Sequence, residues 1–247
     1  LADLILDADS NVRRGLLSTF DENQNVFQGL AASLSSIYLD KKGIEAIYDP
    51  KQKSLRLGKA VFYPFTRKEF AYRDIDERIY QILINYRSLK QDFETVTLRD
   101  VLDGNLSEKQ VRSRIVLIGT TAKSVNDFHS IGYASGVKNE NIRIPGVKIH
   151  AHLASQILSG ALDGRPMINV LSYQKEFLWI LCWSFTGSCV IWVLLQVNSK
   201  REKDFFGLTL LGISIAVGTL IVCCYGSFLI GWWIPAVSPF FALITSA

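Results

Sequence analysis

Residues 114–119 read Arg-Ile-Val-Leu-Ile-Gly, in which an uninterrupted apolar run, rich in β-branched side chains, ends in glycine. Such runs are typical of strands that are buried on both faces of a parallel sheet. Residues 145–159 begin with Pro-Gly, carry an apolar stripe at helical spacing and are followed by Gly160, a pattern that predicts a helix. A strand that alternates with a helix predicts an α/β domain with a mostly parallel sheet.

The chain before this run supplies further candidate elements of the same domain. Apolar residues recur at helical spacing over residues 27–38, and Gly43 lies beyond them as a candidate C-cap. Residues 61–65 and 82–86 have the composition of strands. Together these patterns place a soluble α/β domain over residues 1–175.

The last part of the chain has a different composition. Its final 71 residues contain five charged residues, all within residues 200–204. Each remaining run of about 20 uncharged residues is long enough to cross the hydrocarbon core of a bilayer. The sequence therefore predicts that residues 176–247 form an all-α bundle of three transmembrane helices, at about 177–197, 205–225 and 228–247.

The charges between the apolar runs predict how the chain lies in the membrane. Lys200, Arg201 and Lys203 fall in the first connection, and cytoplasmic loops carry an excess of such residues. We therefore expect a multi-pass protein of the inner or plasma membrane, with the loop at 198–204 cytoplasmic and residues 1–175 extracytoplasmic. Membrane lipid is then a partner. The modest net charge of +4 gives no reason to expect nucleic acid as a partner.

The sulfur-containing residues add two expectations. All four cysteines lie in the apolar runs, and a soluble domain without cysteine suits an oxidising compartment. Met167 is the only methionine, so the sequence does not begin at a start codon. We therefore expect it to be a piece of a longer protein.

Most motifs with catalytic or metal-binding potential fail on spacing. Residues 118–124 have no glycine directly before Lys123 and so lack the spacing of a phosphate loop, and the chain has no G-x-S-x-G nucleophile elbow. The acidic cluster at residues 7–11 lacks the glycine and glutamate of a calcium loop, so we expect its aspartates to pair with Arg13 and Arg14. His150 and His152 would point about 200° apart on a helix, which does not suit one metal ion.

The prediction is therefore a chain without catalysis, metal or cofactor. Polar residues at the loop ends of the predicted sheet are the candidates for contact with a ligand: Asn85, Arg87, Thr120, Thr121, Asp127 and His150.

Five short motifs in order along the chain resemble the CHASE2 domain. They are Asp7-x-Asp9-x-x-Val12-Arg13-Arg14, Ile84-Asn85-Tyr86-Arg87, Asp100-Val101-Leu102-x-Gly104, Ile115 to Ala122 with Asp127, and Pro145-Gly146-Val147-x-Ile149-His150-Ala151. The chain departs from the family pattern at Ser10, where glycine is usual, and after Asp127, where a Thr-Pro pair is absent.

The resemblance implies an extracellular sensory domain of bacterial receptors, frequent in cyanobacteria and followed by three membrane helices. It implies an unidentified extracytoplasmic ligand, a covalently attached output domain and a possible homodimer as partners. Residues 155–158 and 162–166 resemble relatives that carry a protease-like CHAT domain. The predicted function is accordingly the sensory and anchoring part of a transmembrane receptor. The alternative is a membrane-anchored assembly scaffold for an attached CHAT-like effector domain.

Overall fold

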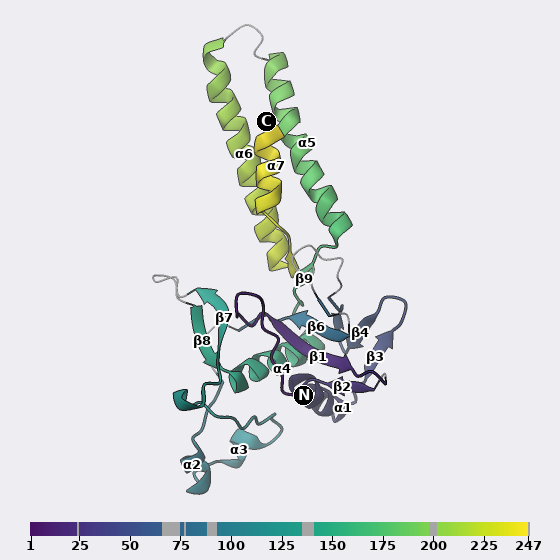
Figure 1. Cartoon of the computed structure of the whole chain (residues 1–247), viewed down its shortest axis with the longest axis vertical. Coiled ribbons are helices and arrows are strands. Elements are labelled where there is room, and N and C mark those ends of the chain that lie inside the picture. The colour runs from purple at the N-terminus through teal and green to yellow at the C-terminus, as the bar shows by residue number, and fades with distance from the viewer. Residues whose placement is uncertain are drawn as a thin grey trace. The chain divides into compact units, whose positions relative to one another are not determined.

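The computed structural model describes residues 1–23, 25–65, 75–76, 78–87, 93–134, 141–197 and 202–246. The chain forms two compact units (Figure 1). The first consists of Leu1–Phe65 and Asp76–Met167, and the second of Thr66–Ile75 and Ile168–Ala247.

The strands of the first unit pair in antiparallel fashion. One sheet has the order β2-β1-β6, from β1 (Arg14–Phe20), β2 (Val26–Gln28) and β6 (Ile79–Leu83). A second has the order β3-β4-β5, from β3 (Ala46–Asp49), β4 (Ser54–Leu57) and β5 (Ala60–Phe62). The strands β7 (Phe128–Ala134) and β8 (Asn141–Pro145) form a two-stranded antiparallel sheet.

The prediction of a mostly parallel sheet is therefore wrong. Parallel neighbours need a long crossover between them, whereas tight turns join antiparallel neighbours. The connections within β3-β4-β5 are such turns, with positive φ at Lys53 and at Gly58. The expected strands at residues 61–65 and 82–86 correspond to β5 and β6, each displaced toward the N-terminus.

The run at residues 114–119 forms no strand, which contradicts the sequence prediction. Val116 is 54% exposed and Ile118 is 95% exposed. A strand needs a neighbour for its backbone N–H and C=O groups, and no strand in the described ranges pairs with this segment. The composition of residues 114–119 favours a strand, but whether a strand forms depends on a neighbouring strand that tertiary contacts must bring to it.

Two helices pack together in the first unit, α1 (Leu30–Asp40) and α4 (Gly146–Asp163). The predicted helix at 27–38 thus begins three residues later than expected, because residues 26–28 are β2. The predicted end of α4 at Gly160 is also wrong. A Cβ at Gly160 would lie 2.3 Å from Cε of Met167, so this glycine permits close packing, and Gly164 with φ 78° ends the helix.

The shorter elements of this unit are α2 (Leu98–Leu102), α3 (Glu108–Val111) and the 3₁₀ turn η1 (Lys123–Val125). The core lies where α4 crosses the sheet of β1. A Cβ at Gly15 in β1 would come within 2.6 Å of Cδ1 of Leu153 in α4. The core includes Val12, Leu17, Leu39, Phe62, Ile82, Ile149, Leu153 and Ile157.

The second unit contains α5 (Tyr173–Val197), α6 (Glu202–Leu229) and α7 (Val237–Ser246), with β9 (Asn169–Val170) paired in parallel with β10 (Trp232–Trp233). Two of its helical segments, Tyr173–Gln196 and Gly207–Leu229, are long and apolar enough to cross a membrane.

The prediction of a third spanning helix at 228–247 is not confirmed. At about 1.5 Å per residue, α7 is about 15 Å long, half of a hydrocarbon core of about 30 Å. The apolar run is interrupted at Gly231, where φ is 87°, and at Pro235. The short helix α7 packs beside α5 instead, where a Cβ at Gly187 would lie 2.3 Å from the carbonyl oxygen of Leu243 (Figure 1).

Candidate functional site

The six residues that sequence reasoning selected lie at different places in the first unit. Asn85 and Arg87 follow β6 and contact α4. His150 belongs to the N-terminal half of α4, which also borders Asp127. Thr120 and Thr121 are exposed in the segment before η1.

Asp127 meets the N-terminus of α4. Its backbone carbonyl accepts a hydrogen bond from the N–H of Gly146 at 3.0 Å, and a Cβ at Gly146 would lie 2.6 Å from its Oδ1. The same Oδ1 lies 2.9 Å from Nε2 of His129. Because a carboxylate is favourable at a helix N-terminus, this arrangement explains how β7 is anchored to α4.

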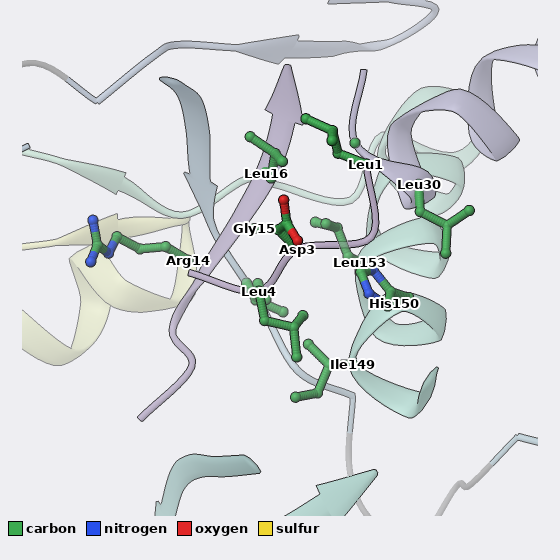
Figure 2. A pocket seen from close by; sticks show the side chains of 12 residues that line it. Leu1, Asp3, Leu4, Arg14, Gly15, Leu16, Leu30, Ile149, His150 and Leu153 are labelled. Atoms are coloured by element: carbon green, nitrogen blue, oxygen red, sulfur yellow. The ribbon is translucent and has the colours of Figure 1, made fainter. Parts of the chain in front are cut away.

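His150 lies in a crevice that the N-terminal segment covers. Its side chain is buried, and this burial lowers the pKa of the imidazole below its usual range. Figure 2 shows the guanidinium of Arg14 turned away from the other side chains. The crevice has space of about 10 Å³, enough for about one water molecule. Its lining is Leu1, Asp3, Leu4, Arg14, Gly15, Leu16, Gly29, Leu30, Ile84, Ile149, His150 and Leu153.

The aspartates at the N-terminal turn pair with arginines, as the sequence predicts. The carboxylate of Asp7 bridges Nη1 of Arg13 at 2.9 Å and Nε of Arg14 at 2.6 Å. Asp9 adds a second bond to Arg13 at 2.6 Å, and this bond holds the pKa of Asp9 well below its usual range. These ion pairs tie the turn to β1, so their role is structural.

The segment after β6 is held by two side chains of α4. Gln156 is fully buried; its Oε1 accepts the N–H of Asn85 at 2.8 Å and its Nε2 donates to the carbonyl of Leu83 at 3.0 Å. His152 is also buried, and its Nδ1 accepts the N–H of Arg87 at 3.4 Å. Sequence reasoning missed Gln156, although a polar residue among the apolar positions of a helix was a detectable signal.

His152 has aromatic neighbours. Its ring meets those of Tyr86 and Phe93 edge-on, at centroid distances of 5.3 and 4.9 Å. Tyr86 also donates from its hydroxyl to the carbonyl of Val12 at 2.8 Å, and burial raises the pKa of this phenol. His150 and His152 therefore occupy different environments, as their spacing on a helix predicts.

A second arginine reaches the same segment. Nη2 of Arg165, which follows the C-cap of α4, donates to the carbonyl of Asn85 at 3.2 Å. Burial, and then the charge of Arg87, lower the pKa of Arg165. Nε of Arg87 is buried and has no hydrogen-bond partner among the described residues. The fold thus gathers two half-buried cations at Asn85, an arrangement that suits an anion.

Comparisons with known proteins assign the chain to a family. Neither the curated proteins nor the solved structures contain a match to the chain. The family model of the CHASE2 domain matches residues 1–189, most of the chain. CHASE2 domains are sensory and extracellular, and they are not catalytic. The chain belongs to the CHASE2 domain family.

Proposed function

We propose that the chain is the sensory and membrane-anchoring part of a bacterial transmembrane signalling receptor. The observation that carries this proposal is the continuity of a CHASE2 domain with two apolar helices that are long enough to span a membrane. Lys200, Arg201 and Lys203 lie between or next to these helices, which favours a cytoplasmic location for this connection. Residues 1–175 then face the outside, where they meet an extracytoplasmic ligand.

The proposed mechanism is a shift between two arrangements of the outer domain. A ligand that binds one arrangement more tightly increases its population, and only this difference in affinity can produce a signal. Residues 164–172 connect the end of α4 directly to α5. A conformational change in residues 164–172 is therefore transmitted through the backbone to α5, and from there to an attached output domain.

The membrane topology is tested with single cysteines in a background in which Cys182, Cys189, Cys223 and Cys224 are replaced by serine. Lys51→Cys lies in the exposed turn between β3 and β4, and Ser199→Cys lies between the apolar helices. In spheroplasts, an impermeant maleimide should label Lys51→Cys at once and Ser199→Cys only after the membrane is permeabilised. The reverse pattern would contradict the proposal.

A second function, a membrane-anchored assembly scaffold for an attached CHAT-like effector domain, is favoured by a different observation. Val116 and Ile118 are exposed in an apolar run, and exposed apolar surface commonly marks protein contacts. If the domain is a scaffold, Val116→Lys with Ile118→Lys should reduce the mass of the complex in sedimentation. A sensor without this role would keep the same mass.

A further inference from the structure

We propose that Arg87 and Arg165 form a binding site for a small oxyanion, a ligand that carries a carboxylate, phosphate or sulfate group. The proposal deepens the sensory function by naming a ligand class, and it rests on that function for the link between binding and signalling. Both arginines belong to the first unit, so the site lies within one compact body.

The first argument is geometric. Segment 85–87 and the loop after α4 meet at one carbonyl, because Arg165 donates to the backbone oxygen of Asn85, two residues before Arg87. Gln156 and His152 hold the backbone of this segment in place by hydrogen bonds to Asn85 and Arg87. The guanidinium of Arg87 is therefore carried by a fixed backbone, and that of Arg165 is held at the carbonyl of Asn85, which reduces the ordering cost of binding.

The second argument is the missing countercharge. Arg13, Arg14 and Arg78 each pair with an aspartate. Arg87 and Arg165 are half-buried, yet neither pairs with a carboxylate in the part of the chain that the structure describes. Two like charges that are partly removed from water destabilise one another, and a bound anion relieves this repulsion.

The third argument is the supply of hydrogen-bond donors. A guanidinium carries several N–H groups in a planar fork, which fits the oxygens of a carboxylate or phosphate in pairs. Arg165 uses one such group on the carbonyl of Asn85, and Nε of Arg87 is unused within the described residues. The remaining N–H groups can only donate hydrogen bonds, because a guanidinium has no acceptor atom. The complementary ligand is therefore an oxyanion, which supplies both acceptor oxygens and negative charge.

The position of Arg165 connects binding to the rest of the chain. It lies between Gly164, which caps α4, and Tyr173, which begins α5. An anion that draws Arg87 and Arg165 together acts directly on the segment that leads into the first apolar helix.

The test measures thermal unfolding of the full chain in nanodiscs of phosphatidylcholine, with inorganic phosphate or citrate at constant ionic strength. Constant ionic strength and matched variants are needed because phosphate also stabilises folded proteins non-specifically. Arg87→Gln and Arg165→Gln remove the two proposed contacts. Arg56→Gln is the matched control, since Arg56 is exposed on β4. Arg87→Lys and Arg165→Lys retain the charge but lose the fork, and they serve if a glutamine variant does not fold.

We expect phosphate or citrate to raise the Tm of the wild type and of Arg56→Gln. The glutamine variants should bind about tenfold more weakly or worse, with the lysine variants between them. Stabilisation that appears only in phosphatidylglycerol nanodiscs, and that the glutamine variants abolish, also supports the site and identifies a lipid headgroup as the source of the anion. No stabilisation, or the same stabilisation in every variant, would overturn the proposal. Cysteine labelling reads the topology separately, so the proposed function can survive that result.

Discussion

Gln156 in α4 accepts the backbone N–H of Asn85 at 2.8 Å with a side chain that is fully shielded from solvent. The same amide donates to the carbonyl of Leu83 at 3.0 Å, so one side chain of α4 bonds to the end of β6, which also pairs with β1 at Leu83. The carbonyl of Asn85 in turn accepts a hydrogen bond from the guanidinium of Arg165, and Arg87 lies two residues after Asn85. The buried amide of Gln156 therefore holds part of the backbone that carries the candidate anion site.

Gln156→Leu should destabilise the first unit by roughly 2–4 kcal/mol, because it leaves the N–H of Asn85 and the carbonyl of Leu83 without partners. Chemical denaturation of the full chain measures this loss. Gln52→Leu, in the exposed turn before β4, is the control and should change stability by no more than about 0.5 kcal/mol. Equal effects of the two substitutions would contradict the role of Gln156.

Asp7→Asn should also be strongly destabilising, by roughly 3 kcal/mol, because Asp7 and Arg14 are nearly buried and the change leaves that arginine without its carboxylate. Asp76→Asn breaks an exposed pair with Arg78 and should cause a much smaller loss, because exposed ion pairs contribute little to stability. Denaturation midpoints of the two variants provide the comparison. A larger loss for Asp76→Asn would show that the bridge at Asp7 does not stabilise the turn.

Stability should depend on pH through His150. Burial lowers its folded-state pKa below the unfolded value of 6.5, so the unfolded chain binds the proton more readily. Its contribution is present in full above about pH 6.5 and is lost as the pH falls toward the depressed pKa. His150→Gln should therefore flatten the dependence of Tm on pH below about 6.5. Parallel curves for wild type and His150→Gln would refute this assignment.

Gly187→Ala should loosen the contact between α5 and α7, because its Cβ would lie 2.3 Å from the backbone carbonyl of Leu243, which cannot rotate away. Overpacking of this kind costs about 1–3 kcal/mol. Trp183 is buried in the second unit, so its fluorescence during thermal unfolding in detergent reports the change. Gly218→Ala on α6 meets no atom within 4 Å and should behave like the wild type. A normal Gly187→Ala would contradict the close packing.

Features that depend on local composition could be predicted from the sequence. The uncharged runs predicted α5 and α6, the Pro-Gly start predicted α4, and the charge pattern at residues 7–14 predicted the ion pairs of Asp7 and Asp9. Each of these depends on residues that are close together in the chain. The length of α7 could not be read from hydrophobicity, since Gly231 and Pro235 interrupt the helix without changing the composition of the run.

Features that depend on distant contacts could not be predicted. Residues 114–119 have the composition of a buried strand, but their pairing is decided by the rest of the fold, and Ile118 is exposed. Asn85 and Arg87 were selected from their place at a loop end, whereas Arg165 was not. Only the folded chain brings Arg165 to the carbonyl of Asn85.

The most direct test of the sensory account is hydrogen exchange of the full chain in nanodiscs, with and without saturating phosphate or citrate. The account predicts slower exchange at residues 83–87, at residues 164–172 and in the first turns of α5, because one ligand-favoured arrangement must reach the apolar helix. Arg165→Gln should abolish all three effects together. Exchange that stays unchanged in residues 164–172 and α5, while the anion is bound, would contradict a sensory role for this site.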